Sequence, residues 1–146
     1  MNTKIVSLFL TLSIILFNVI SCKSQSTSFN DKEITSMLKD FYTNYIVERS
    51  KMPEDFKKID SILKKYGTAD LQNQIRNEDI DYDLLLNSQF CEKEWLNTLT
   101  IKKDSNDSSI YKVSFGYMAD GKRKQKIVKL QIMKDSTSYK INKVIE

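Results

Sequence analysis

Residues 110–145 read IYKVSFGYMADGKRKQKIVKLQIMKDSTSYKINKVI, and the spacing of their hydrophobic residues decides the fold. Apolar and polar side chains alternate from Trp95 onward, which is typical of strands with one buried face. The apolar positions are Leu99 and Ile101, then Tyr111, Val113, Phe115 and Tyr117, then Val128, Leu130 and Ile132, then Tyr139, Ile141 and Ile145. Asp120 and Gly121 are a strong signal for a two-residue hairpin turn. We therefore expect four antiparallel strands joined by hairpins.

A helical period precedes these strands. Asn30 and Glu33 have the spacing of a capping box, and Phe29 is placed to act as its hydrophobic staple. The apolar residues that follow recur three or four positions apart, so we expect a first helix over residues 30–48. The residues on its apolar face are Ile34, Leu38, Phe41, Tyr42, Tyr45 and Ile46.

Two shorter helices are expected between this helix and the strands. Pro53 suits the first turn of a second helix, and Gly67 suits its end. The apolar side of that helix comprises Phe56, Ile59, Leu63 and Tyr66. A third helix with a thin apolar face is expected from Thr68 or Asp70 through Ile75. Helices followed by hairpin-linked strands predict an α+β fold, in which a curved sheet lays its apolar face on the first helix.

The N-terminus has the layout of a secretory signal. Lys4 precedes an uncharged run over residues 5–20, which is shorter than a membrane span and ends in small residues. Residues 19–22, Val-Ile-Ser-Cys, resemble the bacterial lipobox, which implies cleavage before Cys22 and acyl chains on that cysteine. The alternative is an uncleaved N-terminal anchor with an incidental cysteine.

These features predict the organisation of the whole chain. We expect residues 1–21 to be a signal peptide that is removed, and residues 22–29 to be the lipid-attachment cysteine and a tether. Residues 30–146 would then form one α+β domain. Several acyl chains at Cys22 would hold this domain on a membrane that it does not span.

The composition limits the chemistry. The chain has 146 residues, 40% hydrophobic and 29% charged, with three glycines and one proline, which argues for an ordered globular domain. It has no histidine, which removes the Ser-His-Asp and Cys-His nucleophile systems, a histidine general base and imidazole metal sites. If Cys22 carries lipid, Cys91 has no partner for a disulfide within the chain. We expect Cys91 to be a buried core thiol, because no basic residue neighbours it in the sequence.

Several of these features together resemble one family. They are the lipidated N-terminus, an aromatic first helix with Phe41, Tyr42, Tyr45 and Ile46, an acidic loop with Asp79, Asp81 and Asp83 that leads to Gln89 and Trp95, and hairpin strands that close at residues 139–145. The pattern resembles a group of small bacterial envelope lipoproteins of unknown function, placed in the nuclear-transport-factor-2-like, or cystatin-like, superfamily. This resemblance implies a conical cavity between the sheet and the helices. Some members use it as an active site and others for binding or dimerisation.

Two sets of residues are candidates for a functional site. The candidate lining of a pocket comprises Tyr42, Tyr45, Trp95, Phe115 and Tyr117. The candidate polar contacts with a ligand or partner are Asp81, Asp83, Gln89, Lys122, Arg123 and Lys124. A carboxylate in an apolar cone can act as a general base without histidine, and Asp81 or Asp83 would be the first choice. Nothing in the sequence fixes a second catalytic group, so we expect a protein that is not an enzyme and uses no cofactor.

Charge is distributed unevenly along the chain. Residues 78–101 contain six acids and one base, whereas residues 102–146 contain eleven bases and five acids. The basic residues of the expected hairpin are Lys122, Arg123, Lys124, Lys126 and Lys129. They would suit anionic lipid headgroups or an acidic partner. The simpler interpretation is that these lysines keep exposed strand edges from pairing. Nucleic acid is a poor candidate ligand for an exported, tethered domain.

The acidic loop also invites a metal hypothesis. Glu78, Asp79, Asp81 and Asp83 offer the oxygens that hard cations prefer. An EF-hand is excluded, because Leu84 and Phe90 stand where that loop needs glycine and glutamate. Two alternatives remain, an irregular calcium site and a solvated acidic loop that binds no metal, and we expect the second.

Two functions from different classes remain. The first is an envelope lipoprotein that binds a small molecule or an envelope component in a cone-shaped pocket. The second is a protein-interaction module, such as an immunity lipoprotein that blocks a partner enzyme, with electrostatic steering by the acidic loop or the basic hairpin. A homodimer through the sheet is compatible with both. No acidic cluster follows Cys22, so we expect an anchor that faces the periplasm.

Overall fold

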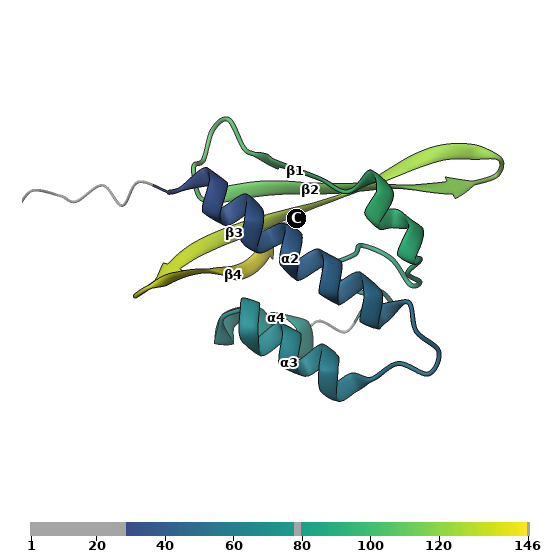
Figure 1. Cartoon of the computed structure of the whole chain (residues 1–146), viewed down its shortest axis with the longest axis horizontal. Helices are drawn as coiled ribbons and strands as arrows, with labels where there is room; N and C mark the ends of the chain where they lie inside the picture. The colour runs from purple at the N-terminus through teal and green to yellow at the C-terminus, as the bar shows by residue number, and fades with distance from the viewer. Residues whose placement is uncertain (1–28, 78–79, 146) are drawn as a thin grey trace, which may run out of the picture.

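The computed structural model describes residues 29–77 and 80–145, and it places three helices ahead of a four-stranded antiparallel sheet (Figure 1). The elements in chain order are α2 (Asp31–Arg49), α3 (Phe56–Tyr66), α4 (Ala69–Asn77), the 3₁₀ helix η2 (Lys93–Thr98), β1 (Thr100–Lys103), β2 (Ile110–Ala119), β3 (Lys122–Asp135) and β4 (Ser138–Ile145). The strand order is β1-β2-β3-β4, and every neighbouring pair is antiparallel. The expected α+β class is therefore confirmed. The expected signal peptide and Cys22 lie outside the described residues.

The long helix α2 begins where the capping pattern predicts. The Asn30 side chain accepts a hydrogen bond from the N–H of Glu33 at 3.4 Å. The N–H of Asn30 donates to the hydroxyl of Tyr139 at 2.9 Å, so β4 takes the place of the return bond of a capping box. Phe29 stacks on the same Tyr139 ring, with centroids 5.8 Å apart. The start of α2 is thus attached to the last strand.

The second helix differs from its prediction. It begins at Phe56, after Asp55, whose side chain accepts from the N–H of Lys58 at 3.2 Å. The Asp55 side chain supplies the oxygen that caps the start of α3. Pro53 therefore lies two residues before this cap and not in the first turn of the helix. Phe56, expected on the apolar side, is 72% exposed.

Gly67 ends α3 as predicted and allows a close approach. Its N–H donates to the carbonyl of Leu63 at 2.8 Å. A Cβ at this position would lie 2.7 Å from the Leu71 side chain, so only glycine fits here without movement. Leu71 is the one fully buried residue of α4, in agreement with the thin apolar face expected for the third helix.

The strand half follows its prediction in β2 and β3, and departs from it at both ends. Asp120 and Gly121 have φ values of 53° and 70° and form the expected turn between β2 and β3. Trp95 lies in η2 and not in a strand, and β1 begins only at Thr100. In β4 the register passes from Gln131↔Lys143 to Ile132↔Ile141.

That change of register is a β-bulge at Asn142, which re-aims the end of the strand. Because one residue is left without a partner, the alternation shifts by one position after the bulge. Val144 is therefore buried, and Ile145, expected on the inner face, is half-buried.

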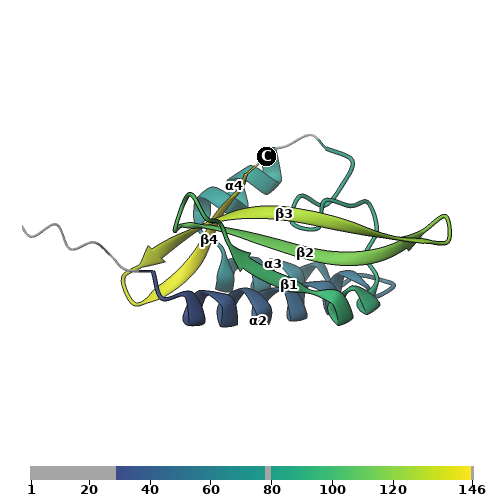
Figure 2. The ribbon, with the colours of Figure 1, turned by 90° about the horizontal axis from the view of Figure 1, so that it is seen from above.

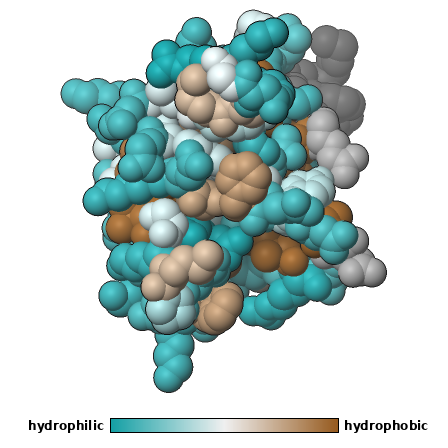
Figure 3. Space-filling view, turned by 90° about the vertical axis from the view of Figure 1, so that its right-hand side faces the viewer, coloured by the Kyte–Doolittle hydropathy of each residue, from teal (hydrophilic) through white to brown (hydrophobic). Residues whose placement is uncertain are grey.

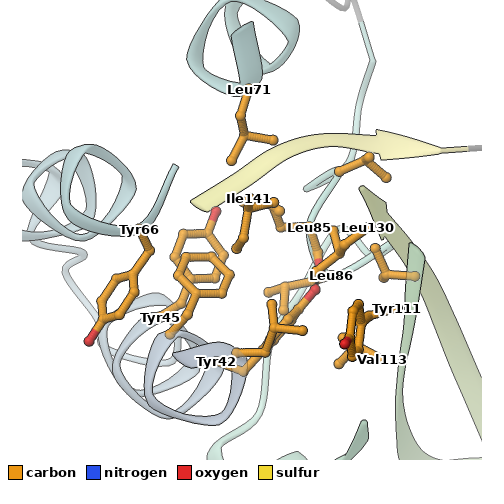
Figure 4. Packing of buried hydrophobic residues seen from close by; sticks show 14 of the residues in the cluster. Tyr42, Tyr45, Tyr66, Leu71, Leu85, Leu86, Tyr111, Val113, Leu130 and Ile141 are labelled. Carbon is orange, nitrogen blue, oxygen red and sulfur yellow. Dashed lines mark hydrogen bonds between the residues drawn. The ribbon is translucent and has the colours of Figure 1, made fainter. Parts of the chain in front are cut away.

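The core lies between α2 and the sheet. Leu85 and Leu86, from the loop after α4, are fully buried and lie between Tyr42 of α2 and the strands (Figure 4). Figure 2 shows α2 running along one face of the sheet, and α4 lies beside β4. Gln74 of α4 bonds both the N–H and the carbonyl of Val144, at 2.9 and 3.0 Å. Through Leu85 and Leu86, the loop after α4 is thus part of the core.

Candidate functional site

A buried carboxylate joins α2 to the loop that follows α4. The Asp83 side chain is 5% exposed. Its Oδ2 accepts hydrogen bonds from Tyr45 Oη and Arg49 Nε, both at 2.8 Å. Its Oδ1 accepts from the N–H groups of Leu85 and Leu86, at 2.9 and 3.2 Å. Asp83 therefore holds the two core leucines and the helix together.

The protonation of this cluster follows from its burial. Burial raises the pKa of Asp83 above its usual range, although the Arg49 charge and the donors around the carboxylate oppose this. Burial, reinforced by Asp83, holds the pKa of Tyr45 well above that of an ordinary tyrosine, so its hydroxyl is a donor. Burial works against the charge of Arg49, but Asp83, Tyr45 and Glu54 outweigh it and raise the Arg49 pKa. Arg49 also pairs with Glu54, so it bridges two carboxylates.

A hollow of about 500 Å³ opens beside this cluster. It brings together four of the predicted residues, Tyr45, Asp81, Asp83 and Gln89. Arg49 also lines it and was missed by the sequence analysis. The missed signal was its position four residues after Tyr45, which places both side chains on one helix face.

The other aromatic candidates pack against one another. Tyr42, Trp95 and Phe115 are each at most 1% exposed. Trp95 stacks on Phe115 with centroids 5.1 Å apart, and Tyr42 lies 6.2 Å from Phe115. The Tyr42 hydroxyl donates to the carbonyl of Leu85 at 2.9 Å. These rings occupy the space between α2 and β2, while half-buried Tyr117 contacts Trp95 at the rim, at 6.2 Å.

Cys91 is half-buried and packs against the core. Its Sγ lies 3.7 Å from the carbonyl of Ile46, to which it donates. Burial raises the pKa of the thiol to about 12, and Asp83 adds to the shift. The thiol is therefore protonated at neutral pH, and it lies at the border of the core, only half-buried where the sequence predicted full burial.

The basic hairpin projects beyond the rest of the sheet. Its tip is the turn between β2 and β3, which Figure 1 shows extending past β1 and β4. Lys122, Arg123 and Lys124 are all exposed there, and Lys124 pairs with Asp120 at 3.1 Å. Figure 3 faces this end of the molecule and shows hydrophilic side chains over most of it, with separate hydrophobic ones between them. The three predicted basic residues thus lie together at the hairpin tip, and none of them lines the hollow at Asp83.

Two further properties concern the described residues only. Residues 29–77 and 80–145 contain no group of three or more acidic or cysteine side chains placed to hold a metal ion. Glu78 and Asp79 of the proposed acidic loop lie outside this part of the chain. No helix in the same ranges is long and apolar enough to cross a membrane.

Comparison with known proteins supports the fold. No protein-family model and no curated protein sequence matches the chain. It is similar to a protein of unknown function from Bacteroides thetaiotaomicron VPI-5482, with a TM-score of 0.69 and 20% identity over 97% of this chain and 99% of that one. It is also similar to a chain of the type VI effector-immunity complex Tae3-Tai3 from Ralstonia pickettii. That TM-score is 0.54, with 18% identity over 76% of this chain and 92% of the other. At these identities the likeness shows a shared α+β fold.

Proposed function

We propose that this chain is a lipid-anchored envelope protein that binds a protein partner and blocks it, in the manner of an immunity protein. The observation that carries the proposal is the exposed basic hairpin with Lys122, Arg123 and Lys124, on a molecule whose space between α2 and β2 is filled by side chains. A partner would therefore meet the outer surface, where clustered charge steers association.

The fold comparison is consistent with this role. A chain of an effector-immunity complex has a similar arrangement of helices and sheet. The whole sequence has no histidine, which favours the immunity side of such a pair over an effector that needs a histidine base. The fold would then be a filled variant of the nuclear-transport-factor-2-like cone, without catalysis.

The membrane anchor is part of the same proposal. Cys22, at the end of the lipobox-like residues 19–22, would carry the acyl chains and hold the domain on the periplasmic side of a membrane. Metabolic labelling with an alkyne fatty acid tests this. The wild-type chain should take up label and sediment with membranes, and Cys22→Ser should lose the label and leave the membrane fraction. Label retained by Cys22→Ser would contradict the anchor.

A competition experiment tests the blocking function. A strain that lacks this chain is mixed with its parent on a surface, where cells touch, and in shaken liquid, where they seldom do. The deletion strain should decline relative to its parent on the surface only, and the wild-type chain should rescue it. Equal survival of both strains in contact would reject the immunity role.

A small-molecule role is the second candidate, because the hollow of about 500 Å³ is lined by Tyr45, Arg49 and Asp83. Its volume is within the range of ordinary ligand pockets. Native mass spectrometry of the protein released gently from envelopes decides between the two. A bound small molecule that Gln89→Ala displaces would favour the pocket, and a protein adduct would favour the blocking role.

A further inference from the structure

Strand β3 is longer than β4, the strand that pairs with it along the edge facing away from β2. β3 has 14 residues and β4 has 8. The pairing of β4 with β3 begins at Lys129 and ends at Asp135. From residue 122 to residue 128, β3 therefore has β2 on one side and no described strand on the other.

The register identifies the backbone groups at this open edge. The N–H of Ile132 donates to the carbonyl of Ser109, on the β2 side, at 2.7 Å. In an antiparallel ladder the direction of the backbone groups alternates along the strand. The N–H and C=O groups of Arg123, Gln125 and Ile127 therefore point away from β2 and into the open edge.

The opposite edge of the same hairpin is covered at Gly116. Thr98, at the end of η2, places its hydroxyl 2.7 Å from the N–H of Gly116, which donates to it. The same hydroxyl lies 3.3 Å from the carbonyl of Gly116. η2 thus satisfies the edge of β2 at Gly116, whereas within residues 29–77 and 80–145 no backbone hydrogen bond reaches Gln125 from the side away from β2. One edge of the projecting hairpin remains able to accept a strand.

The charge along the open edge selects what can bind there. Lys122, Lys124 and Lys126 project from one face of this segment and Arg123 from the other, since successive side chains alternate. A second copy of this chain would bring the same basic residues opposite them, which disfavours edge-to-edge pairing. An acidic segment would instead be attracted from both faces.

A notch at one end of the edge supplies an apolar contact. It has a volume of about 270 Å³ and lies where β4 ends. Its apolar lining comprises Tyr82, Leu84, Ile127, Val128, Val144 and Ile145. Tyr82 and Ile127 are 41% and 52% exposed, so both side chains are accessible to a binding segment. The loop that follows α4 reaches this end of β3, where Lys126 Nζ donates a hydrogen bond to the carbonyl of Asn87.

We propose that the open edge of β3 binds an extended, acidic segment of the protein partner by strand addition, with one apolar side chain of that segment seated in the notch. Backbone hydrogen bonds to Arg123, Gln125 and Ile127 would supply affinity, and the basic side chains would supply selectivity. This inference rests on the proposed function, because it names the surface through which the chain would engage its partner.

Photo-crosslinking in the native envelope tests the surface. A benzoylphenylalanine is placed in the full-length chain at Gln125, or at Lys57 on the exposed side of α3 as the control. The Gln125 position should form an adduct with one protein, through a peptide rich in Asp or Glu, and the Lys57 position should not. An adduct with a second copy of this chain would overturn the proposal in favour of a homodimer.

Two matched variants test the mechanism. Gln125→Pro removes an edge N–H and spares the ladder with β2, whereas Gln125→Ala keeps that N–H. Capture of the crosslinked protein should fall at least about tenfold for Gln125→Pro, and stay near the wild-type level for Gln125→Ala, at equal melting temperatures. If Gln125→Pro unfolds the protein, Lys122→Glu combined with Arg123→Glu replaces it, and the same loss is expected.

The outcomes separate this inference from the function it rests on. If both Gln125 variants and the charge reversal capture the partner as well as the wild type does, the partner binds elsewhere and only the edge proposal fails. If adducts form at Lys57 alone, the result is the same. If no protein adduct forms at either position and no deletion phenotype exists, the edge proposal and the proposed function both fail.

Discussion

Asp81 and Asp83 are two residues apart and were equal candidates from the sequence, but their substitution should have very different effects. Asp81 is exposed, whereas Asp83 accepts four hydrogen bonds in a buried site. Asp83→Ala would leave the Tyr45 hydroxyl, the Arg49 guanidinium and two backbone N–H groups without their acceptor. We expect Asp83→Ala to destabilise the fold strongly and Asp81→Ala to leave it almost unchanged.

The magnitude follows from the burial of the partners. Removing one member of a buried ion pair costs about 3–5 kcal/mol. The Arg49 side chain is 23% exposed and keeps its contact with Glu54, which reduces the cost toward the lower limit. We therefore expect a loss of about 3 kcal/mol for Asp83→Ala, and less than about 0.5 kcal/mol for Asp81→Ala.

Urea unfolding at pH 7, followed by circular dichroism and tryptophan fluorescence, measures both values. Trp95 is a suitable reporter because it is buried and is the only tryptophan of the chain. A double-mutant cycle with Arg49→Met and Asp83→Asn isolates the coupling between the two side chains. A loss below 1 kcal/mol for Asp83→Ala, or equal losses for both alanine variants, would refute the structural role of Asp83.

Three further outcomes are expected. Because burial raises the pKa of Asp83, this carboxyl group holds a proton more tightly in the folded protein than in the unfolded chain. The free energy of unfolding of the wild type relative to Asp83→Asn should therefore be greatest below about pH 3.8 and fall as the pH rises through the folded pKa. A difference that grows with pH in urea titrations would contradict this. Leu85→Ala should cost about 2–4 kcal/mol, since this loop leucine is fully buried, and a value typical of surface loops would count against its core position. The Cys91 thiol, with a pKa of about 12, should react with iodoacetamide at pH 8 at least about tenfold more slowly in the folded protein than in 8 M urea, and equal rates would contradict its burial.

The local sequence pattern predicted the structure correctly where contacts between residues close in the chain determine it. The alternation of Tyr111, Val113 and Phe115 predicted a buried strand face, and the expected first helix differs from α2 by one residue at each end. The turn at Asp120 and Gly121 followed from backbone preferences alone, because both residues adopt positive φ.

The misses share a different cause. Leu85 and Leu86 have neither a helical nor a strand period, and they are buried only because Asp83 folds their loop against α2. The bulge at Asn142 moved Val144 into the core in place of Ile145, and no local signal marks that shift. Both features depend on residues distant in the chain.

The sequence by itself determined the fold class, the order of helices and strands, the lack of histidine chemistry and the basic character of the hairpin, because these depend on composition and on short-range periodicity. Only the tertiary structure decided that Asp83 is a buried anchor while Asp81 faces solvent, since burial is set by contacts with α2. It also decided that β3 extends beyond β4, so that no strand of the described residues pairs with Arg123, Gln125 and Ile127 on the side away from β2. The lengths of paired strands are fixed only when both are packed on the same core.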